Sequence, residues 1–79
     1  MRAYPSDAPI ARVIRALEAL GFTTVSAREH VILTPPEERY EVRIIVLDRA
    51  WTISRGALRW TITRANLPRE DFLDAYARA

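Results

Sequence analysis

The sequence predicts an α+β domain in which helices pack on one face of a three-stranded antiparallel sheet, forming a small two-layer sandwich. The prediction rests on three patterns in order: an amphipathic helix, three β-rich runs with short links, and two further helical segments. The 79 residues suffice for one domain, which we place at 1–79 with its core from about 8 to 77.

The first helix is predicted over residues 8 to 20. Apolar side chains recur at 3.6-residue spacing, at Ile10, Val13, Ile14, Leu17 and Leu20. Asp7 is a suitable N-cap, Pro9 suits the first turn, and Gly21 is a suitable C-terminal stop.

Two strands are predicted over 22–26 and 30–34, which are rich in β-branched and aromatic residues, and the short gap between them indicates a hairpin. A turn follows at 35–38, because proline donates no hydrogen bond to a strand ladder. The third strand is predicted from Tyr40 to about Leu47. Its helix-facing residues are predicted to be Val42, Ile44 and Val46, and its opposite face to carry Glu41, Arg43, Ile45 and Leu47.

Ser54 is predicted to cap a second helix that ends near Asn66 and packs through Leu58, Ile62 and Ala65. Pro68 is predicted to open a short last helix in which Phe72, Leu73 and Tyr76 pack. The element order is therefore α-β-β-β-α plus a short C-terminal helix.

The composition argues against a metal centre or a tightly bound cofactor, because the chain has no cysteine and one histidine. The N-terminal residues lack the apolar stretch of a secretory signal, and no apolar run of about 20 residues is present, so we expect a cytoplasmic protein without membrane contact. All twelve basic residues are arginine, which favours phosphate-bearing partners such as nucleic acid. Genomic base composition or a hot habitat explains the same bias equally well.

His30 is the candidate catalytic residue, because an exposed imidazole exchanges protons near neutral pH. Strand alternation places it with Ile32 and Thr34, on the sheet face opposite to Val31 and Leu33. Without further information, a lone histidine at a strand end is more often a structural or surface residue than a catalytic one.

Several residues are candidate phosphate contacts. At the start of the second helix these are Ser54, Arg55, Gly56 and Arg59, since free helix amides attract phosphate, glycine permits close approach, and the two arginines lie one turn apart. Arg28 and Arg43 are further candidates. The alternative is a capped surface helix with solvated arginines.

Trp60 lies about 200° around the helix from Leu58, so we expect it outside the core with Arg64 placed for a cation–π contact. Together with Trp51 in the preceding loop, Trp60 and Arg64 form a candidate partner surface. The alternatives are that Trp60 packs under the last helix beside Phe72 or Tyr76, and that Trp51 stacks on a base or covers the core edge.

Four segments together resemble the HicA family of bacterial toxins over about residues 9 to 76. They are Ile14-Arg15-Ala16-Leu17-Glu18-Ala19-Leu20-Gly21-Phe22, His30-Val31-Ile32-Leu33, Ser54-Arg55-Gly56-Ala57-Leu58-Arg59 and Arg64-Ala65-Asn66-Leu67. The resemblance implies a fold like that of double-stranded RNA-binding domains, messenger RNA cleavage, and a HicB-like antitoxin partner. It also implies that His30 is catalytic. The chain departs from the family pattern where Arg28-Glu29 replaces glycine-serine, where Leu47 replaces a common proline, and at Trp51, in a loop that is usually basic.

The leading hypothesis is therefore metal-independent cleavage of RNA with His30 as general base and arginines at the phosphate. Because the reaction uses a 2′-hydroxyl, DNA is not expected to be cut or bound by this chain alone. Two alternatives stay open: a non-catalytic RNA-binding module, and a degenerate toxin that acts only by binding another protein.

Overall fold

The structure is a computed structural model that describes residues 2–36 and 41–79. The predicted turn at Glu37 and Glu38 and the predicted strand start at Tyr40 lie outside the described residues. The elements, in chain order, are β1 (Ala8–Pro9), α1 (Ile10–Ala19), β2 (Thr23–Ser26), β3 (His30–Thr34), β4 (Ile45–Asp48), β5 (Thr52–Ile53), α2 (Arg55–Arg64) and α3 (Arg69–Arg78).

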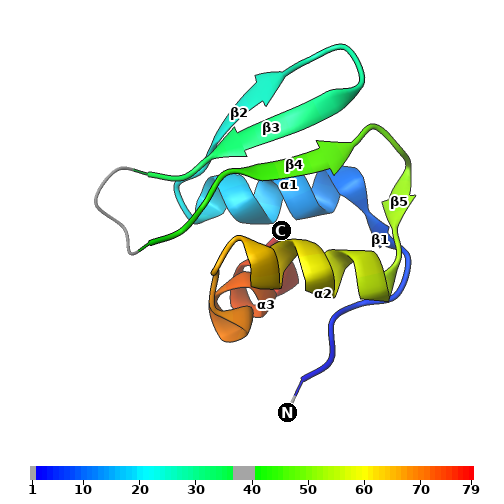
Figure 1. The fold of residues 1–79 in the computed structure, drawn as a ribbon. Helices are drawn as coiled ribbons and strands as arrows, with labels where there is room; N and C mark the ends of the chain where they lie inside the picture. The colour runs from blue at the N-terminus through cyan, green and yellow to red at the C-terminus, as the bar shows by residue number, and fades with distance from the viewer. Residues whose placement is uncertain (1, 37–40) are drawn as a thin grey trace.

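The main sheet has the order β2-β3-β4 with antiparallel pairing, and β1 and β5 form a separate two-stranded ladder. Figure 1 shows α1 and α2 below the sheet, with α3 behind α2. The predicted α+β class and the three-stranded antiparallel sheet are confirmed. The last helix, predicted to be short, is ten residues long, as are α1 and α2.

The start of α1 differs from the prediction. Ala8 and Pro9 pair with Ile53 and Thr52, so the helix begins only at Ile10. Asp7 was wrongly expected to cap the helix: Pro9 occupies the cap position, no side chain caps the helix, and Asp7 adopts a φ of 47°. The sequence pattern missed both two-residue strands because such short pieces carry no periodicity.

Both α1 and α2 end in the same backbone motif. After α1, Gly21 has a φ of 99°, and the amide of Phe22 reaches back to the carbonyl of Leu17. After α2, Asn66 has a φ of 63°, and the amide of Leu67 reaches back to Ile62. These bonds satisfy carbonyls that the helix itself leaves unpaired. The predicted helix ends at Gly21 and Asn66 are confirmed.

The start and the face of the third strand were predicted wrongly. The strand begins only at Ile45, since the described residues 41–44 form no strand, although Val42 does pack against the core as expected. Ile45 and Leu47 are buried, whereas Ile44 and Val46 are exposed, so the strand presents the opposite set of side chains to the helices. A one-residue shift in a strand moves every side chain to the other face. Because residues 44–47 are all apolar, their polarity does not distinguish the two registers.

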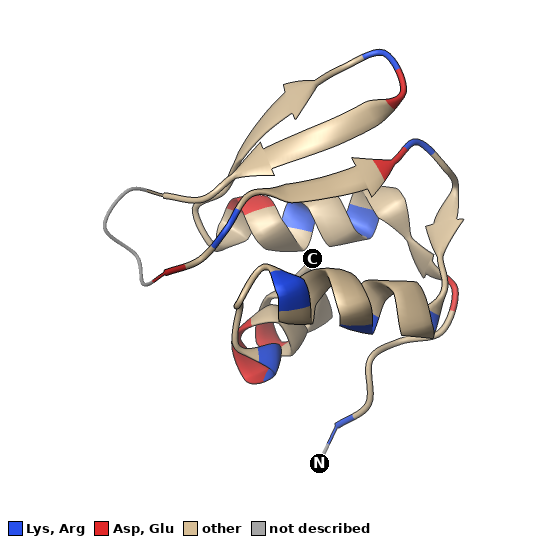
Figure 2. Cartoon of the chain, viewed as in Figure 1, with Lys and Arg blue, Asp and Glu red and all other residues tan. Residues whose placement is uncertain are grey.

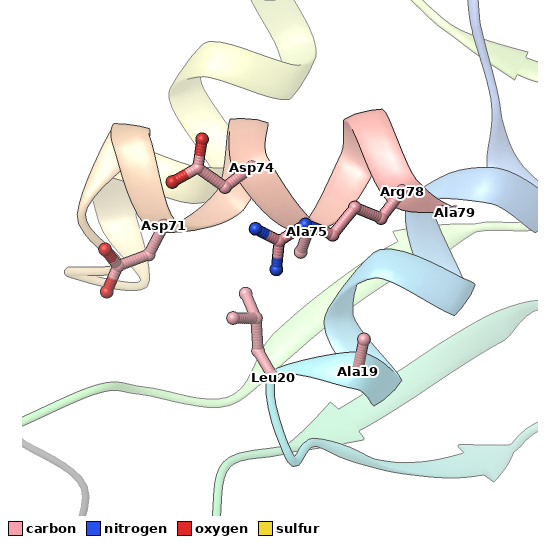
Figure 3. Close-up of a pocket in the computed structure, with 7 residues that line it drawn as sticks. All are labelled: Ala19, Leu20, Asp71, Asp74, Ala75, Arg78 and Ala79. Atoms are coloured by element: carbon pink, nitrogen blue, oxygen red, sulfur yellow. The ribbon is translucent and has the colours of Figure 1, made fainter.

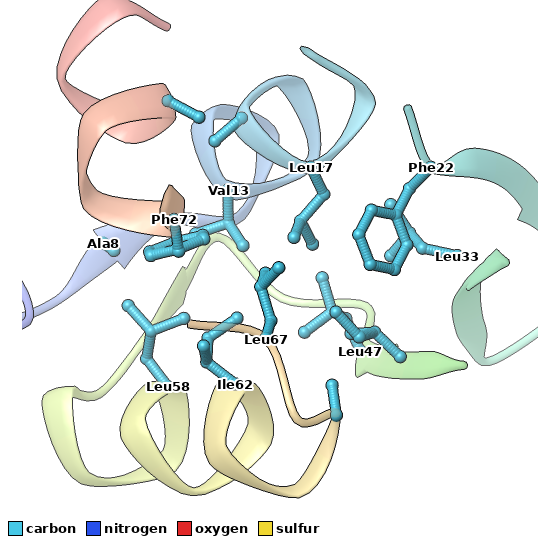
Figure 4. Close-up of a cluster of buried hydrophobic side chains, with 14 of the residues drawn as sticks. Ala8, Val13, Leu17, Phe22, Leu33, Leu47, Leu58, Ile62, Leu67 and Phe72 are labelled. Atoms are coloured by element: carbon cyan, nitrogen blue, oxygen red, sulfur yellow. The ribbon is translucent and has the colours of Figure 1, made fainter. Parts of the chain in front are cut away.

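One core joins all layers (Figure 4). Its largest fully buried side chains include Leu17 from α1, Leu33 and Leu47 from the sheet, Leu58 from α2 and Phe72 from α3. The predicted packing of Leu58, Ile62 and Ala65 is confirmed, as is that of Phe72 and Leu73. In the part of the chain that the structure describes, no helix is long and apolar enough to cross a membrane.

Candidate functional site

His30 opens β3 and lies on the sheet face away from the core. Its neighbour Val31 is buried, and 45% of the His30 side-chain surface is exposed. The predicted alternation is therefore confirmed. The ring is open to solvent and is positioned by the strand without being part of the core.

Asp48 is the partner of His30 across the sheet. The two residues stand opposite each other in the β3–β4 register, and Nε2 of His30 lies 3.3 Å from Oδ1 of Asp48. Because 88% of the Asp48 side chain is exposed, water competes for this carboxylate and the pair adds little to stability. The arrangement leaves Nδ1 of the imidazole as the nitrogen not directed at Asp48.

Arg49 fixes the turn that precedes His30. Its guanidinium donates from Nε and Nη2 to the carbonyl of Ala27, at 3.1 and 3.0 Å, and from Nη2 to Oγ of Ser26, at 2.9 Å. Its amide donates to the carbonyl of Glu29. Arg49 therefore ties the end of β4 to the β2–β3 turn and limits how far His30 can move.

The turn at Arg28 and Glu29 does not need glycine. Among the described residues, the non-glycine positions with positive φ are Asp7 and Asn66, so neither turn residue adopts a strained backbone. Both are exposed, and Arg28 contributes a cation two residues from His30. We call Arg28, His30, Asp48 and Arg49 the histidine surface.

A second group of candidates gathers on α2. Arg43, Gly56, Arg59, Trp60, Thr63, Arg64 and Asn66 line one open pocket of about 730 Å³. We call it the arginine–tryptophan pocket. Helix α2 carries three arginines and no acidic residue, as Figure 2 shows. The sequence predicted these residues as two separate sites, and the fold brings them together.

Arg43 does not lie where the sequence placed it. It was predicted on the sheet face opposite the helices, but its amide donates to the carbonyl of Ala65, 2.8 Å away, just after α2. This bond places the Arg43 side chain beside Arg64 and Trp60. The inverted register of the third strand explains the error.

The two tryptophans differ. Trp60 is 62% exposed, and the guanidinium carbon of Arg64 lies 4.7 Å from the centre of its ring. The predicted cation–π contact is confirmed. Trp51 is 93% exposed in the loop before β5, so neither side chain completes the core.

Two of the predicted phosphate contacts make hydrogen bonds within the fold. Oγ of Ser54 accepts the amide of Ala57 at 3.2 Å and so caps α2, as the alternative reading expected. Nε of Arg55 donates to the carbonyl of Tyr4 at 2.7 Å and holds the N-terminal segment.

A shallow hollow joins the two surfaces. It is lined by Asp48 at one side and by Ala57 and Trp60 at the other, with Val46 and Ile53 among the residues between them. The histidine surface contributes Asp48 to this hollow, and the arginine–tryptophan pocket contributes Trp60.

A further pocket lies between the end of α1 and α3 (Figure 3). Its charged residues are Asp71, Asp74 and Arg78, and Asp74 already binds Arg2 at 2.6 Å. This pair raises the pKa of Arg2, chiefly through the hydrogen bond to Asp74. We assign this pocket to the packing of the chain ends.

Sequence reasoning missed Asp48 and Arg49. Asp48 is the last residue of β4 and Arg49 follows it, and neither belongs to a recognisable motif. Their roles depend on the β3–β4 register, which the sequence did not specify. No family model, curated protein or solved structure matches this chain. The geometry of the two surfaces and the sequence itself therefore carry the functional inference.

Proposed function

We propose that this chain is a HicA-like toxin of a type II toxin–antitoxin pair and cleaves messenger RNA with His30 as general base. The observation that carries the proposal is the open His30 ring, whose side chain is 45% exposed and whose Nε2 lies 3.3 Å from the Asp48 carboxylate. The ring does not pack in the hydrophobic core, so core packing does not account for its position. The resemblance of the sequence to the HicA family supports the same assignment.

In the proposed reaction, a carboxylate at Nε2 favours the tautomer with the proton on that nitrogen, so Nδ1 accepts the substrate proton. Neutral His30 takes the proton of a ribose 2′-hydroxyl, and that oxygen attacks the adjacent phosphorus. The bond to the 5′-oxygen breaks and the leaving oxygen takes a proton from water. The proton held on His30 then neutralises the hydroxide that remains, which returns the ring to its neutral form. The products are a 2′,3′-cyclic phosphate and a 5′-hydroxyl. No step requires a metal ion.

Arg28 is the cation that we assign to the developing charge on the phosphate, since it is exposed in the turn before His30. Arg49 acts through the backbone by holding that turn. A positioned general base contributes a factor of about 10² to 10⁴ to the rate.

The proposal is tested by incubating the purified chain with a radiolabelled RNA, in the presence of EDTA, beside the His30→Ala variant. We expect cleavage by the unmodified chain to cyclic-phosphate ends, a loss of about 10² to 10⁴ in rate for the variant, and no cleavage of DNA of the same sequence. Circular dichroism and RNA affinity, both unchanged in the variant, serve as controls. Equal cleavage by the two proteins, or none by either, contradicts the proposal.

A non-catalytic RNA-binding module is the second candidate function. The observation that favours it is the arginine–tryptophan pocket, which has the chemistry to bind RNA without using His30. Binding without cleavage in the same assay supports this candidate.

We further propose a HicB-like protein as the partner of this chain. Val25, Ile32 and Val46 stand side by side across the sheet on the face that carries His30, and Val25 and Val46 are exposed. An apolar patch beside the catalytic ring suits a protein that covers it. Co-expression with the adjacent reading frame is expected to give a stable complex and to suppress cleavage.

A further inference from the structure

We infer that the arginine–tryptophan pocket binds a single-stranded segment of RNA, with phosphates on its arginines and an unpaired base on Trp60. The inference rests on the proposed function for its choice of RNA as the ligand. It adds a binding subsite on α2 that is separate from the reacting atoms at His30.

The first support is charge. Arg43, Arg59 and Arg64 line one pocket, and none of them has a carboxylate within ion-pair distance among the described residues. The other lining residues are uncharged. Three guanidinium groups that have no ion pair with a described residue attract phosphate, which they bind in a two-pronged fashion.

The second support is the position of Trp60. Its indole lines three adjoining hollows: the arginine–tryptophan pocket, the hollow toward Asp48, and one beside Ile44 and Val46. The ring is 62% exposed, and the Arg64 guanidinium lies over it at 4.7 Å. A base can stack on such a ring without sequence preference, because every base has a π-face.

The third support is Gly56. A Cβ added at this position meets no atom within 4 Å, and the residue does not have a positive φ. Neither crowding nor backbone conformation therefore requires glycine there, although glycine weakens a helix. Gly56 lines the same pocket, and its bare backbone leaves room for a phosphate to approach α2 closely.

The pocket also has a route to His30. The hollow between them is bordered by Asp48, which faces His30, and by Trp60. Along the strand, the four steps from Ile44 to Asp48 cover about 13 Å at about 3.3 Å per residue. A strand gripped at Trp60 can thus cross β4 and present a ribose to the ring.

The test uses the His30→Ala background, so that RNA stays intact, and measures binding of a labelled 12-nucleotide single strand by fluorescence anisotropy. Trp60→Ala is expected to weaken the affinity at least about fivefold, the lower end of the effect of losing one stacked base. The double variant Arg43→Ala/Arg59→Ala is expected to flatten the dependence of log K on log[salt] by about 0.7 per lost phosphate contact.

Matched controls come from the same chain. Trp51→Ala removes the other exposed tryptophan and Arg15→Ala removes an exposed arginine of α1, and both are expected to bind RNA within twofold of the background protein. In addition, Trp51→Phe leaves Trp60 as the one tryptophan, whose fluorescence RNA is expected to quench. In the Trp60→Phe variant, RNA is expected to cause no such quenching of tryptophan fluorescence, even if the variant is less stable than the unmodified chain.

Three results overturn the inference: wild-type affinity in both pocket variants, equal affinity for a duplex of the same sequence, or stronger competition by an acidic peptide than by unlabelled RNA. The last result assigns the pocket to a protein partner. A chain that binds RNA here but does not cleave it removes the nuclease proposal and leaves this inference standing. If all pocket variants still cleave RNA with unchanged KM, this inference is wrong and the nuclease proposal stands.

Discussion

At the residue scale, the role that we propose for Asp48 is to orient His30, and its contribution to stability is small. Both side chains face solvent, and pairs of this kind contribute only about 0 to 1 kcal/mol to folding. A carboxylate that fixes the tautomer and angle of an imidazole acts instead on the rate. The consequence of losing Asp48 should therefore appear in turnover and leave the melting temperature nearly unchanged.

We expect Asp48→Asn to lower kcat for RNA cleavage by about tenfold, within the range that loss of an orienting partner gives, with KM unchanged. The amide keeps the shape of the side chain but removes its charge. Steady-state kinetics on one RNA substrate measure both quantities. Asp48→Glu is the control and is expected to recover part of kcat. A rise in KM with unchanged kcat would assign Asp48 to substrate binding instead.

Tyr4 gives a prediction about alkaline pH. Burial raises its pKa above the ordinary value of 10.0, while the positive charges of Arg69 and Arg59 and a hydrogen bond to Thr63 act in the opposite direction. Because the folded state holds the phenol proton more tightly, the associated stability is complete below pH 10 and is lost as pH rises through the folded pKa.

Tyr4→Phe keeps a ring at this position, 6.2 Å from Phe72 in the present structure, but removes the titrating hydroxyl. We expect the variant to lose less stability than the unmodified chain as the pH rises above about 10, because the pKa of Tyr4 is shifted upward in the folded state. Urea unfolding at several pH values measures this difference. Parallel curves for the two proteins would show that the phenol does not contribute.

The sequence predicted the place of His30 but not its partner, for a physical reason. Strand alternation is a local property, so the buried Val31 and Leu33 are enough to turn His30 outward. The pairing with Asp48 depends on how β4 is aligned with β3. That alignment is set by core packing of residues distant in sequence.

At the element scale, α2 combines folding signals with residues of the proposed binding pocket. Ser54 caps its first turn, whereas Gly56 in the same turn costs helix stability. We expect Ser54→Ala to lower the free energy of unfolding by about 1 kcal/mol, because one helix amide loses its acceptor. Gly56→Ala is expected to raise it by about 0.5 to 1 kcal/mol.

Chemical denaturation of both variants measures these opposite shifts. Gly56→Ala is also expected to weaken RNA binding while it stabilises the helix. These opposite effects test the role of Gly56 in the pocket more specifically than the stability change alone. A variant that is both more stable and binds RNA equally well would show that the glycine has no role in the pocket.

The helices were predictable because their signals are local and redundant. For α1 and α2, periodicity and a left-handed residue after the helix, Gly21 or Asn66, indicate the same ends. The third strand lacks such redundancy. Its run of apolar residues from 44 to 47 fits either face, and the buried pair Ile45 and Leu47 is selected by the volume left between the sheet and the helices.

At the scale of the whole molecule, the fold separates the two candidate surfaces. The histidine surface lies at one end of β3 and β4, and the arginine–tryptophan pocket lies along α2 and the segment before β4. The sequence left open whether the fold brings Arg55 and Arg59 near His30. The fold engages Arg55 with the carbonyl of Tyr4 and places Arg59 in the pocket.

This separation leads to a prediction about combined variants. Substitutions at sites that share no partner change free energies additively, within about 0.5 kcal/mol, whereas members of one network do not. Asp48 and Arg59 share no described contact. We therefore expect Asp48→Asn to lower kcat, Arg59→Ala to raise KM, and the double variant to show the product of both effects in kcat/KM.

The matched pair within one surface, Asp48→Asn with His30→Ala, is expected to be strongly non-additive, because Asp48 has nothing to orient once the ring is gone. Additivity in that second pair would mean that Asp48 acts independently of His30, and coupling in the first would mean that RNA contacts both surfaces as one site.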